Sequence, residues 1–123
     1  MYHGWSDPQV LAMNSVTYFS DVLKTTGQAS AGKSIQLYMV PGMNHCQGGP
    51  GTDTFDKVGA MEQWIASGRA PDQIVASHRT SGKVDRTRPL CPYGKVAKYK
   101  GSGSTDDAAH FACVADSTLR GTR

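Results

Sequence analysis

Between residues 8 and 80 the sequence alternates between helix-like and strand-like patterns, and this alternation restricts the possible fold more than any other feature. Residues 8–25 and 53–68 place apolar side chains mostly at three- and four-residue steps, which is typical of amphipathic helices. Residues 34–40 form a short β-rich segment bounded by glycine and proline, and a second short strand is predicted at 74–79. Because helices that alternate with strands pack in layers against a sheet, we predict an α/β fold.

The predicted helix boundaries follow from residues with strong positional preferences. Asp7 suits the N-cap of the first helix and Pro8 its first position, since a short polar side chain satisfies free N–H groups and proline lacks one. Gly27 and Gly68 are placed to end the two helices. The apolar stripe of the second helix is expected to face the core, and it consists of Val58, Met61, Trp64 and Ile65.

The sequence after residue 82 has no comparable periodicity. The stretch "GSGSTDD" at 101–107 resembles a linker by its composition alone. The basic stretch "KVAKYK" at 95–100 contains one aromatic residue, and it fits a solvated face or an edge strand better than a site for polyanions. The chain contains 14 glycines and 6 prolines, so loops are expected to be extensive and residues 81–123 to be rich in them.

Charge and hydropathy argue against two classes of partner. The net charge of +3 is small, and the lysines and arginines are scattered rather than gathered on one predicted helix. No nucleic-acid partner is therefore expected. No apolar run approaches the roughly 20 residues that a membrane span requires, so no membrane partner is expected either.

Two features lead us to expect that an upstream part of the protein is missing. One clear strand and one weaker strand are too few to make a stable sheet. The chain also begins abruptly in the turn-like sequence "MYHGWSDP", without a secretory signal or a complete first element. We therefore expect the chain to be the C-terminal part of a larger domain.

An aspartate and a histidine occupy two successive loops of the predicted sheet. His45 follows the strand at 34–40, in a loop rich in glycine and proline, and Asp7 lies in the equivalent loop one helix earlier. Because loops beyond the carboxyl ends of strands meet at one edge of an α/β sheet, the two side chains suit the acid and the base of a hydrolase triad. From position alone, Asp7 as a simple cap and His45 as an ordinary loop residue stay open.

A triad also needs a nucleophile, and the sequence does not provide one in the expected context. In α/β-hydrolases the order along the chain is Ser, then Asp or Glu, then His, so the serine is expected upstream of Asp7. No G-x-S-x-G turn occurs in the chain. His3 has no place in this order and is read as loop packing or pocket lining, while His78 and His110 have no catalytic context.

The three cysteines are Cys46, Cys91 and Cys113, and an odd number leaves one of them without a partner. A bridge between Cys91 and Cys113 would close a loop of about twenty residues, leaving Cys46 either free or bonded to a cysteine outside this chain. No cysteine pair or histidine pair has the spacing of a zinc site. The acidic "TDD" at 105–107 offers too few oxygen ligands for calcium.

Several motifs, in order and at sensible spacing, resemble the C-terminal part of the tannase and feruloyl esterase family. They are "HGWSDP", "LYMVPGMNHCQGGPGTDTFD", "MEQWIASGRAPDQIVA" and "RTRPLCPYGKVAKYKGSGSTDDAAHFAC". The resemblance implies that His45 is the catalytic base and Asp7 the triad acid. It also implies that Cys46 is bonded to an upstream cysteine next to the catalytic serine, and that Cys91 and Cys113 form a structural bridge.

The resemblance implies a division and a function for the chain. Residues 1–80 would be the C-terminal part of an α/β-hydrolase catalytic domain, and residues 81–123 a loop-rich, disulfide-stapled extension of it. The intact enzyme would hydrolyse aromatic carboxylic esters, such as hydroxycinnamates or gallates, by a Ser-His-Asp mechanism. This segment alone would be inactive and without a cofactor, since the serine and a calcium-binding lid domain would lie upstream.

The family resemblance also implies a cellular location, and one alternative function stays open. Members of the family are typically secreted or periplasmic, which suits disulfides. The alternative is a stand-alone, disulfide-stapled binding or structural module derived from the esterase C-terminus. Such a module would fold cooperatively by itself and would carry Cys46 as a free thiol.

Overall fold

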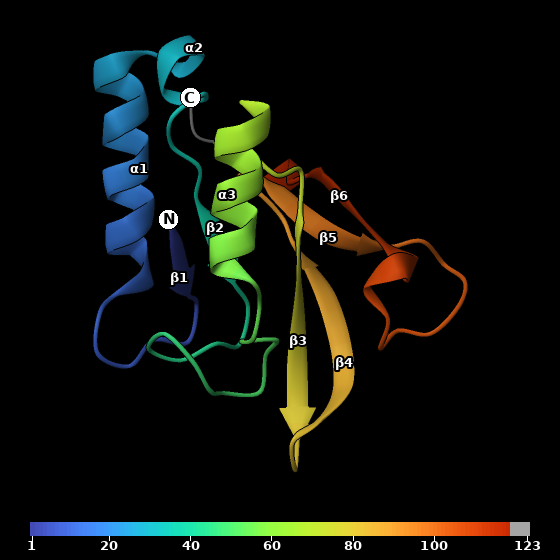
Figure 1. Ribbon diagram of the computed structural model, residues 1–123. Coiled ribbons are helices and arrows are strands. Elements are labelled where there is room, and N and C mark those ends of the chain that lie inside the picture. The colour runs from blue at the N-terminus through green and yellow to red at the C-terminus, as the bar shows by residue number, and fades with distance from the viewer. Residues whose placement is uncertain (119–123) are drawn as a thin grey trace.

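The computed structural model describes residues 1–118 of the 123-residue chain (Figure 1). In chain order, the elements are β1 (Tyr2–Gly4), α1 (Ala12–Thr26), α2 (Gln28–Ala31), β2 (Tyr38–Val40), α3 (Lys57–Ser67), β3 (Ile74–Thr80), β4 (Lys83–Leu90), β5 (Lys95–Tyr99), the 3-10 helix η1 (Ala108–His110) and β6 (Phe111–Ala115). None of the helices within residues 1–118 combines the length and the apolar character that crossing a membrane requires.

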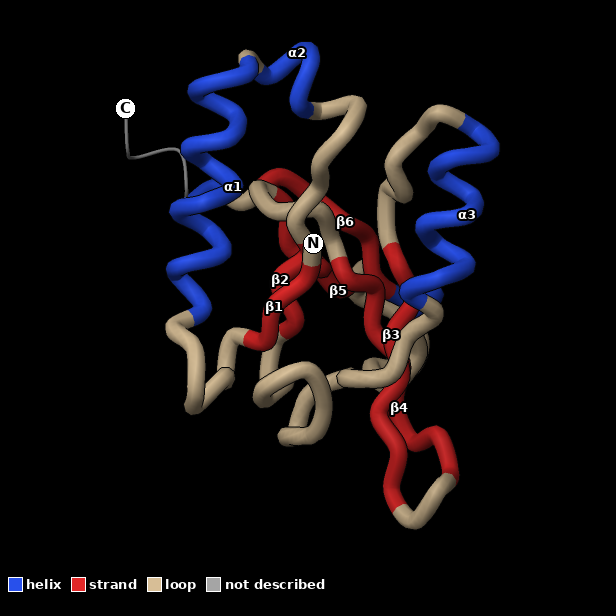
Figure 2. Tube along the Cα trace, turned by 60° about the vertical axis from the view of Figure 1, so that its left-hand side comes forward, coloured by secondary structure: helices blue, strands red, loops and turns tan. Residues whose placement is uncertain are grey.

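The strands pair two by two. β1 and β2 are parallel, with Tyr2 opposite Tyr38 and Gly4 opposite Val40, and α1 lies in the connection between them. β3 pairs with β4 and β5 pairs with β6, both antiparallel. In both views β1 and β2 lie between α1 and α3, while the tip of the β3–β4 hairpin projects away from the rest (Figure 1, Figure 2). The parallel pair is therefore the centre to which the helices are attached.

Strand β2 is buried on both sides, as expected for a strand of a parallel pair. Its successive side chains point to opposite faces, so they enter two different apolar clusters. The cluster on the side of α1 contains Val16, Phe19, Leu37 and Met39. The cluster on the side of β3 and β4 contains Tyr38, Val40, Met43, Ala76 and Leu90. This two-sided packing holds β2 in place, and with it the start of the loop that carries His45.

The first helix is shorter than predicted. α1 starts at Ala12 rather than at residue 8, and no side chain caps its first turn. Asp7 accepts hydrogen bonds from the backbone N–H groups of Gln9 and Val10, which lie in the turn before the helix. The prediction that Asp7 is the N-cap of this helix is therefore wrong, because its carboxylate holds a separate turn.

The second predicted helix also begins late. α3 starts at Lys57 rather than at residue 53, because the Asp56 side chain accepts a hydrogen bond from the Gly59 N–H at 2.8 Å and caps it there. Gly68 ends the helix with a φ of 68°, as predicted.

The apolar stripe of α3 is not buried within residues 1–118. It comprises Val58, Met61 and Ile65, which are 68%, 51% and 76% exposed, and Trp64, which is partly exposed. The prediction that this stripe faces a core is wrong for the described residues. The physical reason is that no described element is packed over this side of the helix.

The strands before residue 80 follow the prediction in part. β3 (Ile74–Thr80) matches the strand predicted at 74–79. β2 occupies only the last part of the segment predicted at 34–40, and the one-turn helix α2 lies in a stretch predicted as loop. β1 was not predicted, since three residues are too few to show a period.

The region after residue 82 contains more strands than the sequence analysis predicted. β4 and β6 were not predicted. Residues 95–100 were predicted to be a solvated face or an edge strand, and β5 is such a strand. The linker-like stretch 101–107 is the loop from β5 to η1. Cys91, directly after β4, forms a disulfide with Cys113 in β6, with Cα atoms 5.5 Å apart. This covalent link stabilises a pair of strands that has little apolar burial of its own.

Candidate active site

The loops after β1 and β2 meet at one end of the parallel pair (Figure 1). Two backbone hydrogen bonds join them, from the Trp5 N–H to the Val40 carbonyl at 2.9 Å and from the Ser6 N–H to the Met43 carbonyl at 3.1 Å. Gly4 makes this approach possible, since a Cβ atom there would overlap the carbonyl oxygen of Met43. The two loops are therefore held together by the backbone.

The Asp7 side chain lies between the loops and is only 2% exposed. Its Oδ1 accepts hydrogen bonds from the backbone N–H groups of Gln9 at 2.8 Å and Val10 at 3.0 Å. Its Oδ2 is 2.8 Å from Nδ1 of His45 and 2.9 Å from Nε2 of His3. Four hydrogen-bond donors, from three separate segments of the chain, thus hold the two carboxylate oxygens.

The surroundings of Asp7 determine which ring nitrogen of His45 faces it as the donor. Burial by itself would raise the pKa of Asp7, but the N–H groups of Val10 and Gln9, followed by His45 and His3, together hold it well below its ordinary value. The carboxylate is therefore ionised at neutral pH and only accepts hydrogen bonds. Nδ1 of His45 must then carry the proton it donates, which leaves Nε2 of the neutral ring as a proton acceptor.

His3 belongs to the site, although the sequence analysis expected only loop packing or pocket lining. Its Nε2 is hydrogen-bonded to the same Asp7 oxygen as Nδ1 of His45, and its Nδ1 is 2.7 Å from the Ser15 hydroxyl oxygen. The available signal was the four-residue spacing of His3 and Asp7, but such a spacing has no fixed meaning outside a helix.

The loop that carries His45 is held by its own hydrogen bonds. The Asn44 N–H donates to the Gly48 carbonyl at 2.9 Å, and the Gly48 N–H donates to Oδ2 of Asp53 at 2.6 Å. The first bond closes the turn that contains His45, and the second holds the end of that turn. Both restrict the backbone that carries His45, while its side chain is 42% exposed.

Comparison with known proteins places the chain in a family. The family model described as tannase and feruloyl esterase matches residues 1–114. The chain belongs to the tannase and feruloyl esterase family. The resemblance stated from the sequence motifs is thereby confirmed.

Curated members of the tannase and feruloyl esterase family are similar over nearly the whole chain. The mono(2-hydroxyethyl) terephthalate hydrolase of Piscinibacter sakaiensis is 46% identical over 94% of this chain, which corresponds to 19% of that enzyme. A probable feruloyl esterase B-1 of Aspergillus flavus is 30% identical over 92% of this chain and 25% of its own length. The chain thus spans about a fifth to a quarter of these relatives.

Solved structures of esterases share the arrangement. Feruloyl esterase B from Aspergillus oryzae superposes with a TM-score of 0.78 and 28% identity, over 92% of this chain and 26% of that one. Another esterase from Aspergillus oryzae gives a TM-score of 0.79 and 29% identity over the same shares. These neighbours are esterases of the α/β-hydrolase type, so the predicted α/β-hydrolase fold class is confirmed.

Of the cysteines that the family resemblance pairs, the structure joins Cys91 to Cys113. Cys46 is exposed and forms no disulfide within residues 1–118. Its φ of 65° lies in the left-handed region, which is uncommon for a residue with a side chain. The backbone turns sharply at Cys46, directly after His45.

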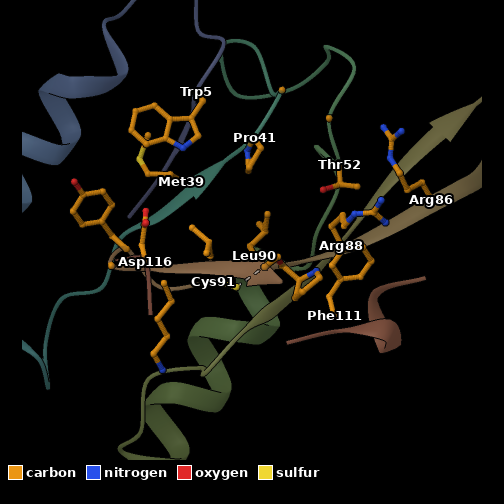
Figure 3. Close-up of a pocket in the computed structure, with 18 of the residues that line it drawn as sticks. Trp5, Met39, Pro41, Thr52, Arg86, Arg88, Leu90, Cys91, Phe111 and Asp116 are labelled. Atoms are coloured by element: carbon orange, nitrogen blue, oxygen red, sulfur yellow. Dashed lines mark hydrogen bonds between the residues drawn. The ribbon is translucent and has the colours of Figure 1, made fainter. Parts of the chain in front are cut away.

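A hollow of about 590 Å³ lies between the parallel pair and the C-terminal strands (Figure 3). Trp5 and Met39 line it on one side, and Arg88 lies on the other with its guanidinium 4.2 Å from the centre of the Phe111 ring. Neither Asp7 nor His45 lines this hollow. Trp5 of the acid loop and Pro41, Gly42 and Pro50 of the histidine loop also line it, so the hollow adjoins both loops.

Among residues 1–118, the remaining titratable groups form pairs and no second site in which two histidines share a carboxylate. His78 pairs with Asp85 at 2.7 Å on the β3–β4 hairpin, and His110 lies 3.9 Å from Asp107. Within residues 1–118, no group of three or more His, Cys, Asp or Glu side chains is arranged to hold a metal ion.

Proposed function

We propose that this chain carries the acid and the base of a carboxylic ester hydrolase, and that an upstream part of the protein carries the serine nucleophile. The observation that supports this most strongly is the 2.8 Å hydrogen bond from Nδ1 of His45 to the buried Asp7 carboxylate. It leaves Nε2 of His45 as a base in an exposed loop of a fold shared with esterases.

The mechanism follows from that geometry. Nε2 of His45 takes the proton of the serine hydroxyl while the serine oxygen attacks the ester carbonyl. Asp7 keeps the ring in the right tautomer and stabilises the imidazolium that forms. His45 then gives its proton to the leaving alcohol, which leaves an acyl-enzyme. In the second half, His45 takes a proton from water while the water oxygen attacks the acyl carbonyl. His45 then returns that proton to the serine oxygen as the bond from serine to the acyl group breaks and the acid leaves.

The substrate that we propose is an ester of an aromatic acid. Two relatives support this choice by what their names say, one a hydrolase of mono(2-hydroxyethyl) terephthalate and the other a probable feruloyl esterase. Terephthalic and ferulic acids are both aromatic carboxylic acids. The particular acid and alcohol depend on a pocket to which the upstream part contributes.

Cys46 supports the same arrangement. We propose that it is bonded to a cysteine next to the upstream serine, because its exposed thiol directly follows the base. Such a bridge would tie the His45 loop to the nucleophile. With it we propose a secreted or periplasmic location, where the Cys91–Cys113 bridge also persists.

The same proposal covers how the chain divides into two parts and whether it binds a cofactor. Residues 1–80 would belong to the catalytic domain and residues 81–123 to its extension. This segment would bind no cofactor, and the calcium of the family would be held by the upstream lid. Neither a nucleic acid nor a membrane is proposed as a partner.

The experiment compares the chain alone with the chain joined to its upstream part. The chain alone should hydrolyse no aryl or feruloyl ester and should not react with a serine-directed fluorophosphonate, since a base without nucleophile and oxyanion hole loses most of the catalysis. The joined protein should do both. Labelling of a serine within this chain would contradict the proposal, because the nucleophile would then not lie upstream. No hydrolysis by the joined protein would contradict it too and would favour a stand-alone binding module.

A further inference from the structure

Two histidines share one oxygen of Asp7, and only His45 is used by the mechanism above. His3 reaches Oδ2 from β1, with its Nε2 at 2.9 Å. Its side chain is 12% exposed, so this hydrogen bond is shielded from water far better than that of the 42% exposed His45. A buried polar contact of this kind is costly to leave unpaired, which indicates a specific role.

The second ring nitrogen of His3 is also held. The Asp7 carboxylate accepts only, so Nε2 of His3 carries a proton and donates it. In the neutral ring Nδ1 is then an acceptor, and the Ser15 hydroxyl at 2.7 Å donates to it. Ser15 belongs to α1, so the chain Ser15–His3–Asp7 connects the carboxylate to a helix packed on the central strands.

We propose that His3 is a positioning residue, which holds the Asp7 carboxylate in the orientation that His45 requires. The inference rests on the proposed function of Asp7 and His45. The two backbone bonds to Oδ1 come from adjacent residues, Gln9 and Val10, and they leave the carboxylate free to turn about that oxygen. The bond from His3 removes this freedom by fixing Oδ2 from a second direction.

The pairing of β1 with β2 does not use the His3 ring. The β1–β2 pairing and the backbone bond from Trp5 to Val40 involve no His3 side-chain atom. Loss of the His3 ring should therefore disturb the Asp7–His45 pair while the two strands stay paired.

The test uses substitutions that keep one ring nitrogen at a time, in the protein that joins this chain to its upstream part. In His3→Gln the side-chain NH₂ takes the place of Nε2 and can still donate to Asp7. In His3→Asn the side-chain carbonyl oxygen takes the place of Nδ1 and can still accept from Ser15, but no side-chain donor reaches Asp7. The control His78→Gln changes a histidine that is also bonded to an aspartate, Asp85 at 2.7 Å, but outside the site.

The kinetic result expected is a split between the two substitutions. His3→Asn should lower kcat for an aryl ester about tenfold with KM unchanged, because a misplaced acid misorients the base. His3→Gln should stay within about threefold of the wild type, and His78→Gln should be unchanged. Equal kcat values for His3→Asn and the wild type would overturn the proposal, as would equal losses in His3→Asn and His3→Gln.

A second readout does not depend on activity and so separates this inference from the proposed function. The proton on Nδ1 of His45, bonded to a carboxylate, should give a low-field NMR signal that disappears in His45→Ala. This signal should shift or broaden in His3→Asn and persist in His3→Gln. An unchanged signal in His3→Asn would refute the positioning role, even in a protein that hydrolyses no ester.

Discussion

The Cys91–Cys113 disulfide gives the most quantitative prediction about the chain itself. The perturbation is the double substitution Cys91→Ala and Cys113→Ala, which removes the bridge between the end of β4 and β6. The two residues are 22 positions apart. In the chain-entropy model, closing a loop of that length lowers the entropy of the unfolded chain by about 11 cal/mol/K. The bridge therefore contributes about 3.4 kcal/mol at 25 °C.

Other contacts in this region do not compensate for the loss. Within residues 1–118, β6 pairs only with β5, and most β5 side chains are exposed, so the pair contributes little apolar burial. Cys91 is 8% exposed, and alanine there keeps an apolar group in a buried position. The main effect of the double substitution is thus the regained freedom of the unfolded chain.

The assay is urea unfolding, followed by the fluorescence of Trp5 and Trp64, both outside the bridged region. With a slope of about 1.5 kcal/mol/M, the midpoint of the double variant should fall by about 2 M. The matched control is Cys46→Ala, which removes an exposed thiol without removing a bridge and should leave the midpoint unchanged. A double variant within about 1 kcal/mol of the wild type would refute the reasoning.

Two further predictions concern the acid and histidine loops. Gly4→Ala should separate the two loops, because the added Cβ overlaps the Met43 carbonyl oxygen. It should lower the free energy of unfolding in urea by about 1–3 kcal/mol and abolish the low-field NMR signal of His45. An unchanged signal would contradict the close approach of the loops. The pKa of Asp7 is lower in the folded chain than in the unfolded one, so below about pH 4 the unfolded chain binds more protons. The contribution of Asp7 to folding stability is therefore complete above about pH 4 and is lost as the pH falls further. Asp7→Asn should therefore make urea stability between pH 2 and 5 less steep, and an unchanged slope would contradict the shift.

The predictable part of the fold is the part with apolar periodicity. Residues 8–25, 34–40 and 74–79 could be recognised because one side of α1, β2 and part of β3 are buried and therefore carry apolar side chains. Asp7 and His45 could be paired because both follow strands of one parallel sheet, whose loops meet at one end.

Other parts of the fold had no apolar period or had a misleading one. β5 is an exposed strand held by pairing with β6, which the disulfide links to Cys91, so its side chains need no apolar period. The α3 stripe has the period of a buried helix side, yet its side chains stay exposed within residues 1–118. His3 joins the site through the geometry of one shared oxygen, which no linear spacing encodes.

The central claim is that His45 acts as the base for an upstream serine. It is tested most directly by steady-state hydrolysis of an aryl ester by the joined protein, with His45→Ala compared with His78→Ala. Since the members of a triad act as a unit, His45→Ala should lower kcat by about four orders of magnitude or more, while His78→Ala should retain the wild-type rate. A His45→Ala protein that keeps more than a tenth of the wild-type kcat would contradict the account.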